Sequence, residues 1–307
     1  MLTSDPRTPR RPPCARQGFT LAELVVAVGV GGVAFGAFAL VVAQQERTHA
    51  ELARRVRAHS QAREGLTALV TELRAVSPLA GDIPAGEARD SSIEFRTAVG
   101  NAVVCDLADN VAGLALASFV TPPEPGDTAW AYVGEDAPSA WTPLALVGVR
   151  TDRVPTCDLP ATVSGLIDGR RAGRPRYSLE LSEVMPRLIQ PGTPLRITRR
   201  VRYSLYRAPD GRWYLGRREW SQARDRFETI QPVAGPYQPY ASEASQTSGL
   251  ELRYVDRGGV QVTSGSPDSD RIAQLIVVLR TPPPPGDSQL RGRRDMIAAA
   301  LAVRSPP

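Results

Sequence analysis

The pattern of hydrophobic and polar positions divides the chain into a helical N-terminal part and a longer part with alternating positions. From Phe19 to Ala43 the only charged residue is Glu23. A helix of about 20 apolar residues is long enough to cross a bilayer core of roughly 30 Å. This pattern predicts a membrane-spanning helix over residues 19–43.

The helical pattern continues beyond the apolar run. Between Gln44 and Val76 there is no proline, and apolar residues recur at three- and four-residue steps, at Leu52, Val56, Leu66, Leu69, Val70, Leu73 and Val76. This spacing is typical of an amphipathic helix that packs on its own domain. A coiled coil is the alternative, but the apolar stripe weakens between Val56 and Leu66 and no sustained heptad follows. Because Ser77-Pro78 disfavours further helix, the helix is predicted to occupy residues 19–77.

After Pro78 the apolar positions alternate with polar ones, which is typical of β-strands. In the clearest hairpin, residues 197–220, Pro209-Asp210-Gly211 forms the turn between two alternating segments. Further strands are predicted at residues 93–96, 103–105, 130–133, 144–149, 250–255, 260–263 and 272–280, a strand or short helix at 295–303, and loops at 122–125, 234–248 and 282–285. The predicted fold is α+β: a long N-terminal helix, membrane-spanning in its first half, packed on an antiparallel β-rich domain of residues 78–307.

The segment before the helix is short, rich in proline and basic, with four arginines at positions 7, 10, 11 and 16. A basic flank stays on the cytoplasmic side of a membrane, so the body is expected on the other side. An ordinary signal peptide is the alternative, because Ala37-Phe38-Ala39 offers a small-x-small cleavage site. Two features oppose it: Glu23 would be a costly unpaired charge in lipid, and the helical pattern runs straight through the site.

The residues Gly18-Phe19-Thr20-Leu21-Ala22-Glu23-Leu24 resemble the prepilin processing motif of type IV pilins and type II secretion pseudopilins. The resemblance covers only the N-terminal segment. It implies that a prepilin peptidase removes a leader of residues 1–18 by cutting between Gly18 and Phe19, and that the new amine of Phe19 is methylated. It also implies that Glu23 pairs with this amine on a neighbouring subunit, which would fix the stagger between helices.

The resemblance implies a minor pilin or minor pseudopilin of the inner membrane, with its domain in the periplasm. Such a protein primes or joins a type IV pilus or a type II secretion pseudopilus. Its partners would be the prepilin peptidase and other major and minor pilins or pseudopilins. In size and layout the chain is similar to the PilW-like minor pilins and the J-type minor pseudopilin. The alternative is a binding module at the filament tip, either an adhesin or a DNA-uptake receptor, which would expose a ligand-sized groove.

The cysteines and histidines add little catalytic chemistry. Of the 3 cysteines, Cys14 lies in the predicted leader, which leaves Cys105 and Cys157. In an exported domain these two suit one disulfide, with two buried free thiols as the alternative. The 2 histidines, His49 and His59, both lie on the predicted helix and lack the spacing of a metal pair. With no catalytic motif in the sequence, no enzymatic activity, cofactor or metal site is expected.

The charge distribution argues against general nucleic-acid binding. The net charge is +5, but much of the excess lies in the predicted leader, and the rest of the chain is close to neutral. Binding to nucleic acid needs a concentrated basic surface. The segment 168–176 holds four arginines, and DNA binding there is an alternative. A solvated loop is favoured because no aromatic residues are interleaved with these arginines.

Overall fold

The computed structural model describes residues 20–108, 111–134, 141–152, 176–182, 189–241, 248–282 and 296–303. These residues form one long α-helix near the N-terminus, followed by an antiparallel β-rich domain, so the predicted α+β class is confirmed. The chain divides into two units, residues 1–56 and 57–307, and the division falls within the helix. The described part of the first unit consists of Thr20 and the first part of the helix, and the second unit contains all the strands that the structure describes.

Helix α1 (Leu21–Leu73) is 53 residues long and ends four residues earlier than the predicted boundary at Ser77. The amides of Ala75 and Val76 donate to the carbonyls of Glu72 and Leu73, which tightens the last turn. The buried carboxylate of Asp82 then accepts a hydrogen bond of 2.7 Å from the amide of Ser77. The chain therefore leaves the helix before Pro78, which begins the short 3₁₀ helix η1 (Pro78–Ala80).

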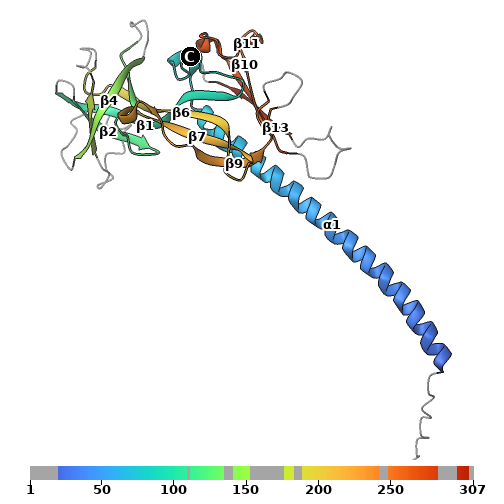
Figure 1. The fold of residues 1–307 in the computed structure, drawn as a ribbon. Helices are drawn as coiled ribbons and strands as arrows, with labels where there is room; N and C mark the ends of the chain where they lie inside the picture. The colour runs from blue at the N-terminus through green and yellow to red at the C-terminus, as the bar shows by residue number, and fades with distance from the viewer. Residues whose placement is uncertain are drawn as a thin grey trace, which may run out of the picture. The chain divides into compact units, whose positions relative to one another are not determined.

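The larger sheet has nine strands, all paired antiparallel, and Figure 1 shows several of them side by side. Its strands are β1 (Ser92–Ala108), β2 (Val111–Phe119), β3 (Thr128–Tyr132), β4 (Trp141–Asp152), β5 (Arg176–Leu181), β6 (Pro194–Arg207), β7 (Trp213–Ser221), β8 (Arg226–Phe227) and β9 (Gln231–Tyr237). The order β1-β2-β5-β4-β3-β6 returns to β1, because β1 also pairs with β6. These strands form a closed ring, and one hydrophobic core, which includes Val104, Leu146, Leu179 and Ile197, lies among them.

The smaller sheet has four strands in the order β11-β10-β12-β13. They are β10 (Leu250–Val255), β11 (Gln261–Val262), β12 (Gln274–Arg280) and β13 (Met296–Ala302), and the 3₁₀ helices η2 (Gln222–Arg224) and η3 (Ser269–Arg271) lie in connections. The second core joins this sheet to α1 and to the larger sheet. Its buried members include Leu69 of α1, Tyr203 of β6, Leu215 of β7 and Val277 of β12.

Most of the predicted strands are confirmed, including the hairpin of β6 and β7 and the strand β13. The two short strands predicted at 93–96 and 103–105 are wrong as separate elements, because β1 is one strand with register shifts between Ala98 and Gly100 and between Asn101 and Ala102. The loop predicted at 234–248 is wrong in its first residues, which belong to β9. Strands β2, β5, β8 and β9 were not predicted.

Candidate functional site

The start of α1 carries the described part of the processing motif. Gly18 and Phe19 lie outside the described residues. Thr20 precedes the helix, and its amide and its Oγ1 hydroxyl each donate a hydrogen bond of 3.0 Å to the Oε2 atom of Glu23. The amide of Glu23 donates back to Thr20 Oγ1 at 3.3 Å. This reciprocal arrangement is a capping box, which satisfies free amides at a helix start. The Thr-x-x-Glu spacing of Thr20 and Glu23 is the sequence signal of a capping box, and the capping box was not among the predictions.

The part of α1 that lies in the first unit presents an apolar surface that is exposed among the described residues. Leu21 is 82% exposed and Phe35 is 73% exposed. Apart from its chain neighbours and the nearby backbone of α1, a Cβ added at Gly29, Gly31, Gly32 or Gly36 would meet no described atom within 4 Å. By length and composition, α1 is the one helix among the described residues that could cross a membrane.

In the second unit, the last turns of α1 approach strand β9 closely at Gly65. A Cβ atom added to Gly65 would lie 2.1 Å from the Tyr237 hydroxyl and 3.2 Å from the Ala234 Cβ. The Tyr237 hydroxyl donates a hydrogen bond of 3.0 Å to the carbonyl of Gln61. Tyr237 is 1% exposed, so its ring fills the space that the missing side chain of Gly65 leaves. Close approach of the helix to the sheet therefore requires glycine at this position.

A network of ion pairs and hydrogen bonds begins at Glu72, in the last turn of α1. Its Oε1 atom accepts hydrogen bonds from the Tyr203 hydroxyl at 3.1 Å and from Arg217 Nε at 3.0 Å. Arg217 also pairs with Glu219, two residues further along β7. Burial, followed by the charge of Glu72, raises the pKa of Tyr203, so the phenol stays protonated and donates. These contacts hold the end of the helix against β6 and β7.

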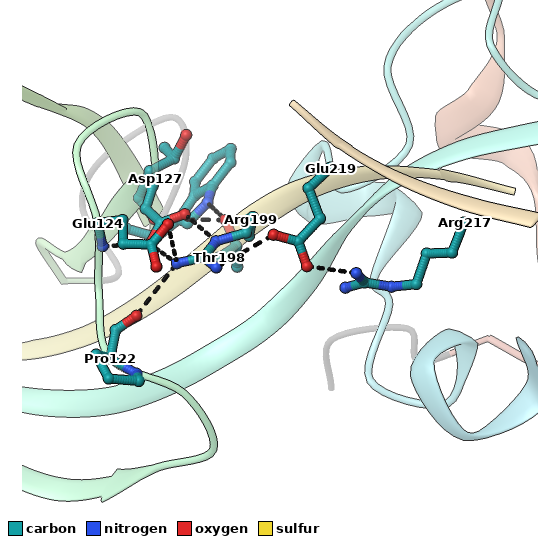
Figure 2. Close-up of polar contacts among 9 residues, drawn as sticks. Pro122, Glu124, Asp127, Thr198, Arg199, Arg217 and Glu219 are labelled. Atoms are coloured by element: carbon teal, nitrogen blue, oxygen red, sulfur yellow. Dashed lines mark hydrogen bonds and ion pairs between the residues drawn. The ribbon is translucent and has the colours of Figure 1, made fainter. Parts of the chain in front are cut away.

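The same network continues to Arg199 on β6. Figure 2 shows Arg199 with its partners. Its guanidinium donates to both carboxylate oxygens of Asp127, from Nε at 2.8 Å and from Nη2 at 2.9 Å. It also donates to the carbonyl of Pro122 at 3.1 Å and to Glu219 at 3.3 Å. Asp127 in turn accepts a hydrogen bond of 2.8 Å from the amide of Glu124, and this contact shapes the predicted loop at residues 122–125. A bidentate arginine–carboxylate pair is among the stronger polar contacts in proteins.

These contacts shift the titration of the buried groups. Hydrogen bonds to Asp127 raise the pKa of Arg199, against the opposing effect of burial. Burial alone would raise the pKa of Glu219, but the hydrogen bond and charge of Arg217, together with Arg199, lower it below its ordinary value. Both groups are therefore charged at neutral pH. Through these contacts the cluster joins the end of α1, strands β6 and β7, and the loop at residues 122–125.

The other residues singled out in the sequence are possible metal ligands, the histidines, the cysteines and the arginine-rich segment. Among the described residues, no three His, Cys, Asp or Glu side chains lie close enough to hold a metal ion. His49 and His59 are exposed on α1, as expected for solvated histidines. Cys105 is disulfide-bonded. Its predicted partner, Cys157, lies outside the described residues, as does Cys14, so the pairing itself stays a prediction. The arginine-rich segment 168–176 is outside the described residues up to residue 175.

Comparison with known proteins gives no relative for this chain: no protein-family model, no curated protein and no solved structure matches it.

Proposed function

We propose that the chain is a prepilin-like protein that is cut between Gly18 and Phe19 and assembled as a minor pilin or minor pseudopilin. One arrangement carries the proposal. The processing motif overlaps the start of an apolar helix, with Glu23 in its first turn, and that helix continues without a break into the core of a β-rich domain. The inner membrane would hold the first half of α1, with the domain in the periplasm. The partners would be the prepilin peptidase and other pilins or pseudopilins.

The unbroken helix is what favours this proposal over an ordinary signal peptide. Cleavage after Ala39 would fall inside α1, which extends from Leu21 to Leu73. It would also remove an apolar segment whose side chains, such as Leu21 and Phe35, are largely exposed among the described residues. An exposed apolar surface of this extent needs lipid or neighbouring proteins to cover it. A subunit that moves from a membrane into a filament of similar helices would have both.

The capping box gives Glu23 two roles that can be separated. Within one chain, its carboxylate caps the first turn of α1 and is favourable near the positive end of the helix dipole. Between chains, the same carboxylate would pair with the methylated amine of Phe19 on a neighbouring subunit. Glutamine supports a capping box as glutamate does, but it carries no charge. Glu23→Gln therefore removes the proposed intersubunit pair and keeps the cap, whereas Glu23→Ala removes both.

The test measures cleavage and filament incorporation of both variants in the native host. We expect both to be cut normally and both to be absent from sheared filaments. If Glu23→Gln enters filaments like the unsubstituted chain while Glu23→Ala does not, Glu23 acts as a helix cap alone. If both variants enter filaments, the proposed pairing is wrong.

A second comparison tests the cleavage site. Gly18→Leu is expected to leave the precursor uncut, because the side chain would crowd the peptidase at the position before the cut. Gly29→Leu is the matched control: Gly29 has open space around it, and the variant should be cut at the normal rate. Normal cleavage of Gly18→Leu would contradict the assigned site.

A further inference from the structure

Three arginines share one face of β6 and β7, and we call them the arginine patch: Arg200, Arg202 and Arg218. Arg202 lies directly opposite Arg218 in the pairing of the two strands, and opposite Glu94 on the other side, in β1. Residues that face each other across antiparallel strands have Cβ atoms about 5 Å apart on the same side of the sheet. The row Glu94, Arg202, Arg218 therefore places two positive charges beside one negative charge.

The carboxylates near the patch do not neutralise it. Glu94 is fully buried and is shared by two arginines: it pairs with Arg200, and it accepts hydrogen bonds from Arg202 at 3.1 and 2.6 Å. Arg202 also reaches Glu87 at 3.2 Å. Arg218 makes no ion pair with any residue that the structure describes, and its Nε atom is buried without a hydrogen-bond partner there. Like charges directly opposite each other in a sheet are destabilising, and an anion bound beside Arg218 would offset this repulsion.

Two aromatic rings hold the patch in place. The guanidinium of Arg200 lies 4.3 Å from the ring centre of Trp220, and that of Arg202 lies 4.4 Å from the ring centre of Phe227. A planar guanidinium stacked on a ring keeps its N–H groups in the plane free to donate. The two arginine side chains are 33% and 34% exposed, so a ligand can reach them. Arg200 and Arg202 are thus positioned before any ligand arrives, which lowers the entropic cost of binding.

We propose that the arginine patch binds the carboxylates of an acidic segment of a partner protein. Charge complementarity points to an anion, and carboxylates match the planar donors of arginine in pairs. Nucleic acid fits less well, because single strands bind by stacking bases on aromatic rings. Here the guanidinium groups of Arg200 and Arg202 already cover Trp220 and Phe227, so these rings are not free to stack on bases. The proposal does not depend on cleavage at Gly18, because every residue of the patch lies in the second unit.

The test uses the full-length chain in neutral detergent and a fluorescein-labelled hexaglutamate peptide, with binding followed by fluorescence anisotropy. We expect saturable binding that weakens as salt is raised, because exposed charge pairs are screened. Arg218→Gln should weaken binding about fivefold or more, which is the scale of one partly exposed charge-assisted hydrogen bond. Arg218→Lys, which keeps the charge, should lose less. Because Arg218 supports no ion pair within the described chain, neither variant should lower the unfolding temperature, and Arg218→Gln, which removes the like charge opposite Arg202, should leave it unchanged or raise it.

Arg257→Gln is the matched control. It removes the same charge from the exposed turn between β10 and β11, and it should bind the peptide like the unsubstituted chain. The proposal is wrong if the peptide does not bind, if Arg218→Gln binds it unchanged, or if Arg257→Gln weakens binding equally. The choice of ligand is wrong if labelled hexathymidylate binds more tightly than hexaglutamate and Arg218→Gln loses that affinity. The patch would then bind nucleic acid and not an acidic protein segment.

Discussion

Replacing Gly65 by alanine tests whether the helix is held against the domain as the structure shows. In an exposed helix interior, Gly→Ala stabilises by about 1 kcal/mol, because alanine loses less backbone entropy on folding. At Gly65 the added Cβ would lie 2.1 Å from the Tyr237 hydroxyl, closer than any real contact of this kind. Relieving such overpacking costs about 1–3 kcal/mol. We therefore expect Gly65→Ala to destabilise the domain, opposite in sign to the effect of helix propensity alone.

The Tyr237→Phe variant tests whether contact with the Tyr237 hydroxyl causes the destabilisation expected of Gly65→Ala. Removing the hydroxyl gives up the hydrogen bond to the Gln61 carbonyl and costs about 1 kcal/mol by itself. It also removes the atom that the new Cβ would meet, so Gly65→Ala should cost less in the Tyr237→Phe background. The two changes should therefore be coupled by about 0.5 kcal/mol or more, as contacting residues are in double-mutant cycles.

The assay is urea unfolding of the full chain in detergent micelles, followed by tryptophan fluorescence, since all four tryptophans lie in the second unit. Gly36→Ala is the control: its Cβ meets nothing within 4 Å, and it should leave the unfolding of the domain unchanged. If Gly65→Ala stabilises the domain by about 1 kcal/mol, the described approach of α1 to β9 is wrong.

Two further predictions concern the domain. Because the folded pKa of Glu219 lies below its ordinary value of 4.5, its contribution to stability is present above that pH and is lost as the pH falls through the folded pKa. Glu219→Gln should thus lower the urea midpoint at pH 7, with a difference that shrinks below pH 4.5, whereas Glu46→Gln on the exposed helix should have little effect at either pH; a difference that grows in acid would contradict the assignment. Mass spectrometry of unreduced peptides should find Cys105 cross-linked to Cys157, and alkylatable thiols at both positions would refute that pairing.

The elements that could be predicted are those whose residue pattern lies within one short stretch of the sequence. The hairpin of β6 and β7 was found because Val201, Tyr203 and Leu205 alternate with polar residues before a Pro-Asp-Gly turn. The helix was found from its apolar run and its spacing. Its end was misplaced because the contacts that end it are distant: Arg196, which donates to the Ala75 carbonyl, is 121 positions away in the chain. A local pattern contains no such information.

The closed ring of strands could not be predicted for the same reason. It depends on β1 pairing with both β2 and β6, and that choice is made between segments far apart in the sequence. Strand β2 is rich in alanine and glycine, residues without the β-branched or aromatic side chains that usually indicate a strand. Of the candidate sites, Glu23 was predicted from its motif. Arg218 was not, because its opposition to Arg202 exists only once the register of β6 and β7 is known.

The N-terminus of the mature protein tests the central claim most directly. Membranes of the native host are solubilised, the chain is isolated, and its N-terminal peptide is analysed by mass spectrometry. The proposal predicts a chain that begins at N-methylated Phe19 and retains the whole of α1. A chain that begins at Leu40, or one that keeps Met1, would contradict it.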